Sequence, residues 1–426
     1  ITINLRKGMA SDSEMSQSSK LESEEAAADT NPAWKGASKR RQKKAKETKK
    51  EARAKKEIFD TIIVGAGAAG IGVGIALAHS GVGNFVIIDR GSVGSSFESW
   101  PEETRFITPS FPSNSIGMLD LNSIAVGVSP AYNMRIEHPT GSEYAQHLQD
   151  LAEFFELPIR ENAEVLQITN EDGVFSVETD DWTISSKNVI WAAGEFLYPR
   201  LEGFPGSELC RHTATLENYA DLDGDDFLVI GGYESGVDAA YHLSKRGKKV
   251  TIFDKDDPWG LDTSDPSVSL STFSYERMRD ASFEDNVTLF AENAVSSIEL
   301  VDGVYELKSE DGQVFKSKTQ PLLASGFVGS HTLVSHLFEE REDGFPLLNE
   351  RDESTKVPGM YLCGPSVRHD NHDFCFIFKF RQRFAVVAQS IASSLDIPTD
   401  EFVQAYRDWG MYLDDLSCCG QECLTC

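Results

Sequence analysis

Short apolar runs rich in β-branched and aromatic residues alternate with amphipathic stretches along the chain from residue 58 onward. Glycine or aspartate bounds most of the runs, and most intervening stretches are long enough for a helix. Continuous apolar runs of this length are typical of strands buried on both faces of a parallel sheet. The pattern therefore predicts an α/β fold built from strand–helix–strand units. The runs read TIIV, FVII, NVIW, FLVI, VTIF, PLLA and MYLC.

The first unit contains a glycine-rich loop between a predicted strand at 61–64 and a helix predicted to end near Ser80. In such a loop the first glycine makes the tight turn, the second admits the backbone to a pyrophosphate, and the third lets the helix pack on the strand. The helix start adds free N–H groups and the positive end of its dipole. A second strand, 85–88, ends at an acid 24 residues after the first glycine, where a carboxylate accepts from ribose hydroxyls. The predicted dinucleotide site comprises Gly65, Gly67, Ala68, Ala69, Gly70, Asp89 and Arg90.

The same layout recurs with a strand at 227–230, a helix to about Arg246 and a strand at 250–253. Tyr233 stands where close approach of a pyrophosphate usually requires glycine, and its backbone is expected to serve if Gly232 absorbs the strain. Asp254, the acid after the second strand, favours binding of the ribose 2′-hydroxyl of NADH. Lysines at 248, 249 and 255 could instead bind a 2′-phosphate, so NADPH stays an alternative. The predicted second site comprises Gly231, Gly232, Glu234, Ser235, Gly236 and Asp254.

Two such loops about 165 residues apart resemble the two-dinucleotide-binding flavoprotein superfamily, which includes flavin-containing monooxygenases and pyridine nucleotide-disulfide oxidoreductases. The resemblance spans about 58–400 and implies two Rossmann-like domains that bind FAD and NAD(P)H, with the NAD(P)H domain inserted in the FAD domain. The implied division is a charged, disordered leader at 1–57, an FAD domain at 58–222 and 325–405, an NAD(P) domain at 223–324, and a cysteine-rich tail at 406–426.

Four further segments carry the resemblance. VIWAAG (189–194) and LLASGF (322–327) match strands at which the chain crosses between the two domains, and PGMYLCGP (358–365) resembles the strand that returns to the flavin. Pro365 replaces the acid that usually follows that strand, so its flavin contact is expected to be missing or supplied elsewhere. VGSSFESWP (93–101) looks like a segment of the monooxygenase and bacillithiol-disulfide-reductase-like branch. These segments add Ser96, Trp100, Gly194, Gly326 and Gly364 to the predicted cofactor site.

Thiols are concentrated at one end of the chain. Residues 90–209 and 211–362 contain no cysteine, so the redox pairs of glutathione-reductase and thioredoxin-reductase types are absent there. Four of the seven cysteines lie in the last nine residues, at Cys418, Cys419, Cys423 and Cys426. Three interpretations are open: a redox relay from flavin to an acceptor, an Fe–S or Zn²⁺ site, and an exposed end without a role.

A polar segment, 369–373, follows the returning strand and is expected at the start of the next helix, beside the flavin. Its His372 is the candidate general acid, because histidine titrates near neutral pH. A metal half-site at His369 and His372 is the alternative.

Composition limits the partners. The leader holds 15 basic and 9 acidic residues, so residues 58–426 hold 25 basic and 59 acidic residues and a net charge of −34. Such a body repels nucleic acid and anionic membranes. The low cysteine count over most of the chain favours a reducing compartment, so a cytoplasmic protein is expected, and a homodimer is left open.

The sequence thus predicts an FAD- and NAD(P)H-dependent oxidoreductase. The first choice of acceptor is a disulfide or other small molecule reached through the C-terminal cysteines. The second is oxygen, in a monooxygenase acting on a small N-, S- or carbonyl-containing substrate. The third function is a flavin-binding redox sensor with little turnover.

Overall fold

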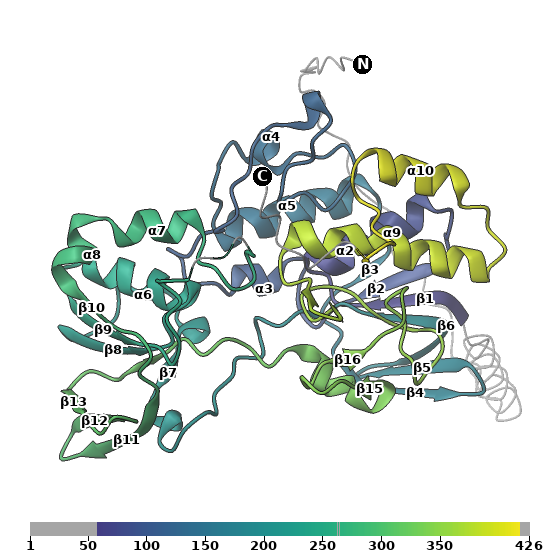
Figure 1. Ribbon diagram of the computed structural model, residues 1–426. Helices are drawn as coiled ribbons and strands as arrows, with labels where there is room; N and C mark the ends of the chain where they lie inside the picture. Colours follow the sequence, from purple (N-terminus) through teal and green to yellow (C-terminus); the bar gives the residue numbers. More distant parts are fainter. Residues whose placement is uncertain (1–57, 262, 264, 418–426) are drawn as a thin grey trace, which may run out of the picture. The chain divides into compact units, whose positions relative to one another are not determined.

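The computed structural model describes residues 58–261, 263 and 265–417. Its first half, made of the residues before and after the inserted segment between β6 and β17, is built on a mixed sheet of seven strands (Figure 1). The strand order is β3-β2-β1-β6-β5-β4, and β17 pairs in parallel with the C-terminal part of β6. Strands β3, β2, β1, β6 and β17 are parallel, whereas β5 and β4 add an antiparallel extension. The strands are β1 (Ile58–Val64), β2 (Phe85–Ile88), β3 (Ile159–Arg160), β4 (Val165–Glu171), β5 (Val174–Thr179), β6 (Thr183–Trp191) and β17 (Met360–Leu362).

Helices α2 (Ala68–His79) and α9 (Ile377–Ser394) pack closely on each other beside this sheet. A Cβ on Gly72 would stand 2.1 Å from the ring of Phe384, so glycine is what permits the close approach. Helix α5 (Gly141–Phe154) begins with a capping box, in which the side chains of Thr140 and Glu143 satisfy each other's backbone N–H groups. The remaining helices of this half are α3 (Ser95–Glu98), α4 (Pro130–Met134) and α10 (Asp400–Asp408).

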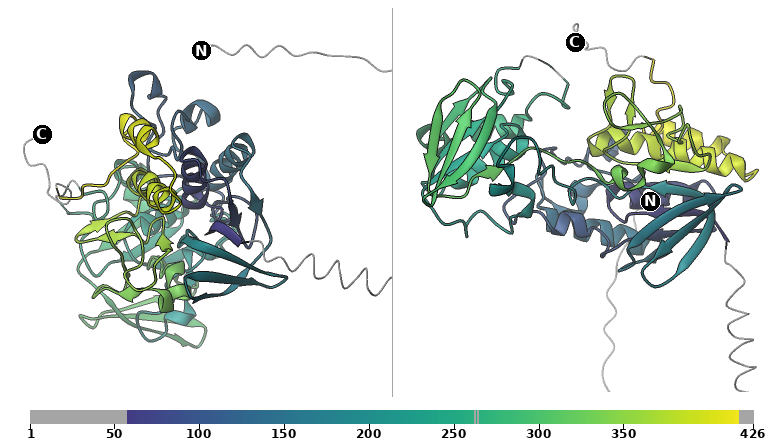
Figure 2. Two further views of the ribbon diagram at one scale, coloured as in Figure 1. Left: turned by 90° about the vertical axis from the view of Figure 1, so that its right-hand side faces the viewer. Right: turned by 90° about the horizontal axis from the view of Figure 1, so that it is seen from below.

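A second, parallel sheet with the order β10-β9-β8-β14-β7 comes from the residues between β6 and β17. An antiparallel sheet of β11, β12 and β13 packs against it through a separate apolar cluster (Figure 2). The strands are β7 (Arg211–His212), β8 (Asp226–Ile230), β9 (Lys249–Phe253), β10 (Val287–Phe290), β11 (Val295–Val301), β12 (Val304–Ser309), β13 (Val314–Ser317) and β14 (Leu322–Leu323). The helices are α6 (Glu234–Ser244), α7 (Thr272–Met278) and α8 (Ala281–Asn286).

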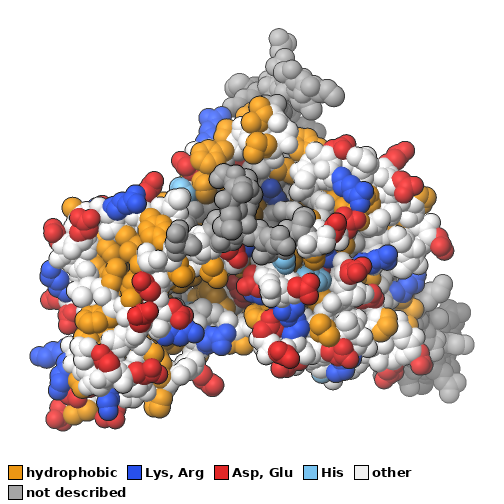
Figure 3. Space-filling model, in the orientation of Figure 1, with side chains coloured by type: hydrophobic (Ala, Val, Ile, Leu, Met, Phe, Trp, Pro, Cys, Tyr) orange, Lys and Arg blue, Asp and Glu red, His pale blue; other side chains and the backbone are white. Residues whose placement is uncertain are grey.

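Short elements complete the described chain. They are η1 (Asn114–Ile116), η2 (Ser207–Leu209), η3 (Thr213–Thr215), η4 (Ser330–Leu337), β15 (Glu339–Glu340), β16 (Pro346–Leu347), β18 (Arg368–His369) and β19 (His372–Asp373). No helix among the described residues is both long and apolar enough to cross a bilayer. Over the described part of the face in Figure 3, basic side chains stand among acidic ones.

The prediction for 369–373 was wrong about its structure. These residues do not begin a helix, because β18 and β19 pair as a hairpin and α9 starts only at Ile377. Asp370 has a left-handed backbone (φ 48°), which an aspartate tolerates in a tight turn. The two crossing strands end earlier than the segments 189–194 and 322–327, since β6 ends at Trp191 and β14 at Leu323.

Candidate active site

The first glycine loop connects β1 to α2 and has two positions with no room for a side chain. A Cβ on Gly65 (φ 111°) would lie 2.4 Å from the Ala192 carbonyl oxygen, and one on Gly70 would lie 1.7 Å from the Gly65 carbonyl oxygen. Gly67 is different, because a Cβ there would meet only the Ser96 hydroxyl oxygen, at 3.8 Å. The loop therefore leaves open space at the position where a pyrophosphate needs it.

Asp89, at the end of β2, is held against this loop. Its carboxylate accepts the backbone N–H groups of Ala66 at 2.6 Å and Gly91 at 2.7 Å. Burial raises the pKa of Asp89, while these two hydrogen bonds and the Arg90 guanidinium lower it. The guanidinium of Arg90 lies 5.3 Å from the ring centre of Tyr198. An acid and a base thus stand together at the end of the loop where the ribose of a dinucleotide is expected.

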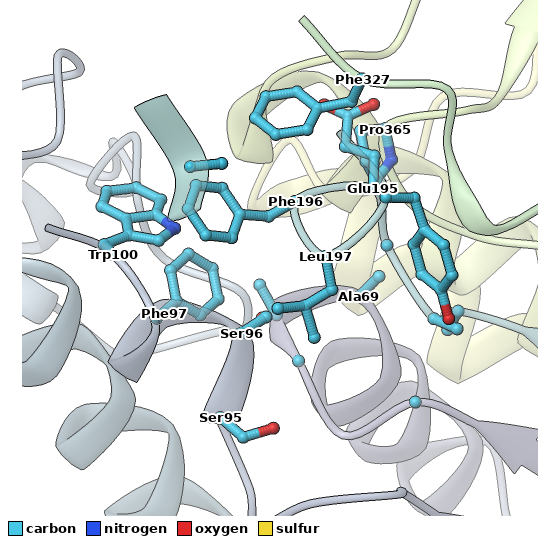
Figure 4. A pocket seen from close by; sticks show the side chains of 18 of the residues that line it. Ala69, Ser95, Ser96, Phe97, Trp100, Glu195, Phe196, Leu197, Phe327 and Pro365 are labelled. Atoms are coloured by element: carbon cyan, nitrogen blue, oxygen red, sulfur yellow. The ribbon is translucent and has the colours of Figure 1, made fainter. Parts of the chain in front are cut away.

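A cavity of about 400 Å³ opens beside the loop. In Figure 4 the ring of Phe196 lies beside Trp100, with 5.8 Å between the ring centres, and Phe196 also contacts Phe327 at 5.4 Å. An apolar, aromatic wall with a few polar groups is typical of a cofactor pocket. Predicted site residues that line it are Gly65, Gly67, Ala68, Ala69, Asp89, Arg90, Ser96, Trp100, Gly194, Glu234 and Ser235.

Other predicted residues do not belong to the cavity wall. Gly70 and Gly236 instead let each helix pack closely on the loop before it. A Cβ on Gly236 would stand 1.9 Å from the Gly231 carbonyl oxygen. Gly364 lies on Ala69, with 3.2 Å between its ideal Cβ and the alanine methyl group. Outside the wall are also Gly231, Gly232, Asp254, Gly326 and His372.

Three wall residues that bear on the chemistry were not among the predicted site residues. Glu195 follows the glycine at the end of the β6 crossing, and burial raises its pKa. Cys375 and Phe376 immediately precede α9. The first turn of α9 therefore lines the cavity, as expected for the helix after the returning strand, but it does so with different residues from those predicted. The Phe-Cys-Phe run offered a signal, because a thiol between aromatic residues at a helix start is unusual for a surface segment.

The second glycine loop connects β8 to α6 and reproduces the first one. Gly231 has a left-handed backbone (φ 102°) as Gly65 does, so the strain expected at Gly232 falls on Gly231 instead. Tyr233 has φ −80° and needs no glycine-like backbone; its hydroxyl donates to the Ser269 carbonyl at 2.8 Å. The indole N–H of Trp259 donates to the Gly232 carbonyl at 2.9 Å. The tyrosine is thus accommodated by the loop that follows β9.

Two acids flank this second loop. Asp254 accepts the Gly232 N–H at 2.6 Å, the same contact that Asp89 makes in the first loop. Glu234 opens α6, and its carboxylate accepts from the Ser274 hydroxyl and the Ser271 N–H, both at 2.5 Å. Burial nevertheless raises the pKa of Glu234. Because Glu234 also lines the cavity, the start of α6 and the first glycine loop face the same space.

Hydrogen bonds join the two halves next to the cavity. Asp238 of α6 is buried, accepts the Thr104 hydroxyl at 2.7 Å, and forms an ion pair with buried Arg277. Glu103 accepts from Arg246 at 2.6 Å and from the Tyr219 N–H at 3.0 Å. His242 and Arg277 hold the pKa of Asp238 below its ordinary value in spite of burial. The segment around residues 103–104 is therefore anchored to the second half by charged groups.

Two predicted histidines and four predicted cysteines remain. The histidines are described by the structure, and the cysteines are not. His369 contacts buried Asp352 at 2.5 Å, and Asp352 also pairs with Arg383, so this histidine belongs to an ion-pair network. The Nε2 atom of His372 is buried without a hydrogen-bond partner. Among the described residues no group of three or more His, Cys, Asp or Glu side chains can hold a metal ion. Cys418, Cys419, Cys423 and Cys426 lie outside the described residues.

Comparison with known proteins adds the family. A family model described as pyridine nucleotide-disulphide oxidoreductase matches residues 62–364, well over half of the chain. Bacilliredoxin reductase Bdr of Bacillus subtilis is 25% identical over 348 residues, which cover 78% of this chain and 97% of Bdr. An uncharacterized CzcO-like oxidoreductase of Geobacillus kaustophilus is 28% identical over 192 residues, and the chain spans only 52% of its length.

Solved structures share the fold. Bacillithiol disulfide reductase Bdr (YpdA) of Staphylococcus aureus superposes with a TM-score of 0.64 at 19% identity, over 79% of this chain and 98% of that one. A flavin-containing monooxygenase of Stenotrophomonas maltophilia superposes with a TM-score of 0.59 at 15% identity, over 79% and 99%. The chain therefore has the mixed α/β fold of these two structures, with parallel sheets.

Proposed function

Because the chain belongs to the pyridine nucleotide-disulphide oxidoreductase family and is an FAD- and NAD(P)H-dependent oxidoreductase, we propose that it reduces a disulfide. The observation that carries this proposal is the similarity to bacilliredoxin reductase along nearly the whole of that enzyme. The proposed reaction takes a hydride from NAD(P)H and delivers two electrons to a disulfide, which leaves as two thiols.

We assign FAD to the first glycine loop and the cavity, because the residues present fit it. The open space at Gly67 and the free N–H groups at the start of α2 suit the pyrophosphate. The carboxylate of Asp89, held at this loop, supports a contact with the ribose, and the aromatic side chains supply an apolar wall. Bound there, FAD supplies the two-electron chemistry that no side chain offers. The start of α9 contributes a positive helix end, which favours negative charge in the cavity.

We assign the nicotinamide cofactor to the second loop and to the space in front of α6. Residues 223–324 then form a Rossmann-like NAD(P)H domain inserted in a Rossmann-like FAD domain of 58–222 and 325–405. Asp254, with acidic Asp256 and Asp257 after it, would repel a 2′-phosphate. Two of the three nearby lysines are engaged elsewhere, Lys248 with Asp225 at 3.1 Å and Lys249 with a backbone carbonyl at 2.9 Å. NADH is therefore the proposed donor.

The C-terminal cysteines are proposed as a relay, and the path of the chain leaves them within reach. The Leu413 N–H donates to Gln382 in α9 at 3.1 Å. Gln382 lies five residues after Ile377, which lines the cavity, so the two are about 8 Å apart along the helix axis. An extended chain spans up to about 3.5 Å per residue, so Cys418 can reach about 17 Å from Leu413 and Cys423 about 35 Å. A relay through these thiols is sterically allowed.

A second candidate is a monooxygenase, favoured by the fold shared with the Stenotrophomonas enzyme. The test is NADH oxidation by the purified flavoprotein, first without oxygen and with added disulfides, then with oxygen alone. A disulfide reductase consumes NADH anaerobically and releases thiols. A monooxygenase requires oxygen and is unaffected by serine at all four tail cysteines, whereas a relay fails without them.

A further inference from the structure

Cys375 is a thiol in the cavity wall that the proposed function has not yet used. It lies between β19 and α9, next to Phe376 and Ile377, and all three residues line the cavity. The other two cysteines among the described residues do not line it. Cys210 packs beside the β11–β13 sheet with a pKa raised to about 12, and Cys363 is buried with a pKa well above its ordinary value.

A polar chain from the second half of the protein meets this thiol. The Cys375 sulfur lies 3.3 Å from the Ser267 hydroxyl oxygen, and the Lys379 ammonium donates to the same oxygen at 2.5 Å. Lys379 also donates to Asp265 at 3.2 Å. Ser267 is thus a bridge between an ammonium group and a thiol, and it comes from the loop that also holds Tyr233. The serine hydroxyl and the lysine ammonium favour the thiolate form of Cys375, whereas burial, the largest effect, disfavours it.

A partly buried carboxyl group, that of Glu195, lines the same cavity. Burial raises the pKa of Glu195, and the Arg368 guanidinium lowers it. Burial raises the pKa of the Cys375 thiol above its ordinary value, and Ser267, Lys379 and the Arg368 guanidinium offset part of that rise. Since both side chains line the cavity, the thiol and the carboxyl group face one space. Neither helix packing nor the FAD assignment explains a partly buried carboxyl group with a raised pKa in this cavity wall.

We propose that Cys375 is the thiol that attacks the disulfide substrate and that Glu195 supplies the proton to the first thiol released. This inference rests on the proposed disulfide reductase function and names the residues of its acceptor site. Ser267 and Lys379 act through Cys375, so they are positioning residues.

The proposed step is balanced. The Cys375 thiolate attacks one sulfur of R–S–S–R, a Cys375–S–S–R bond forms, and the S–S bond of the substrate breaks. The departing thiolate takes the proton of Glu195, which regains one from solvent. The two electrons and the proton of the NAD(P)H hydride then cleave the mixed disulfide, releasing the second thiol and restoring the Cys375 thiolate. The sum is one disulfide, one NAD(P)H and one solvent proton giving two thiols and NAD(P)⁺. A disulfide within the C-terminal tail is a substrate of the same chemistry.

The test uses 5,5′-dithiobis(2-nitrobenzoic acid), whose yellow thiol product is counted by absorbance. The parent is the full-length flavoprotein with serine at 418, 419, 423 and 426, so the tail cannot react. Without NADH, we expect a rapid burst of one thiol product per protein and an adduct in the tryptic peptide 369–379. Cys375→Ser and Cys375→Ala abolish the burst, while the matched control Cys210→Ser retains it. An adduct at Cys210 or Cys363, or a burst that survives in both Cys375 variants, would overturn the inference.

Turnover and pH dependence complete the test in the wild-type chain. Cys375→Ser lowers NADH-driven reduction of the same reagent about 100-fold or more, as for a lost catalytic group. Lys379→Met and Ser267→Ala move the pH midpoint of Cys375 alkylation by iodoacetamide upward, and Lys379→Arg restores it. Unchanged midpoints would refute the positioning roles. If the wild-type chain forms the adduct but reduces no disulfide with NADH or NADPH, the proposed function fails and the assignment of the reactive thiol stands.

Discussion

Gly70→Ala is predicted to destabilise the fold, whereas Gly67→Ala is predicted to weaken FAD binding, although both positions belong to one glycine loop. At Gly70 the new Cβ would stand 1.7 Å from the Gly65 carbonyl oxygen and 2.8 Å from its carbon. Contacts between heavy atoms are favourable near 3.5 Å, and the neighbour here is backbone that cannot rotate away. Overpacking costs about 1–3 kcal/mol where side chains can adjust, so at least about 3 kcal/mol is expected here.

Gly67→Ala is the matched control, because its Cβ meets only the Ser96 hydroxyl at 3.8 Å and its φ of −83° suits alanine. The fold is therefore unaffected, and the methyl group enters the space assigned to the pyrophosphate. We expect FAD to bind about 10- to 100-fold more weakly, which corresponds to about 1.4–2.8 kcal/mol.

The assay is the thermal midpoint at a series of FAD concentrations. Gly70→Ala lowers the midpoint by at least about 6 °C, from about 2 °C per kcal/mol, and added FAD does not remove the deficit. The deficit of Gly67→Ala shrinks as FAD rises, because a ligand that binds the native state stabilises it by mass action. Wild-type stability in Gly70→Ala, or an identical FAD response in both variants, would refute the reasoning.

Three further predictions concern charge. Asp238→Asn leaves the buried guanidinium of Arg277 without its partner and is expected to lower the free energy of unfolding by about 3–5 kcal/mol. The measurement is urea unfolding. The control is Asp225→Asn at an exposed ion pair, which is expected to change the free energy of unfolding little. His147 is buried with its pKa lowered to about 4, so the folded state binds fewer protons than the unfolded state below pH 6.5. The contribution of His147 to the free energy of unfolding is therefore fully present above pH 6.5 and falls by roughly 3 kcal/mol toward pH 4. His147→Gln is expected to remove this part of the pH dependence of unfolding. Asp254→Asn lowers the preference of kcat/KM for NADH over NADPH about 10-fold, and an unchanged ratio would dismiss the carboxylate as the discriminating group.

The parts of the fold governed by local sequence were predictable. The glycine loops at 65–70 and 231–236 fix a turn, a close packing and a helix start within a few residues, and both took the expected structure. Helix ends differed by one or two residues, because the last turn depends on packing beyond the local sequence.

The acceptor side of the site was not predictable in the same way. In the hairpin of β18 and β19, His369 contacts Asp352, which lies 17 residues earlier in the chain. Cys375 gains its neighbour Ser267 from a loop more than 100 residues earlier. Glu195 owes its raised pKa to burial, which a sequence pattern at that position does not reveal. Such groups become visible only when several segments enclose one cavity.

The most direct test of the central claim is the stoichiometry of anaerobic turnover. The full-length flavoprotein is mixed with limiting NADH and excess glutathione disulfide, cystamine or 5,5′-dithiobis(2-nitrobenzoic acid), and NADH loss and new thiols are counted together. A disulfide reductase releases two thiols for every NADH oxidised and needs no oxygen. NADH that is oxidised only when oxygen is admitted, with no thiol released from any of the three disulfides, would contradict the account.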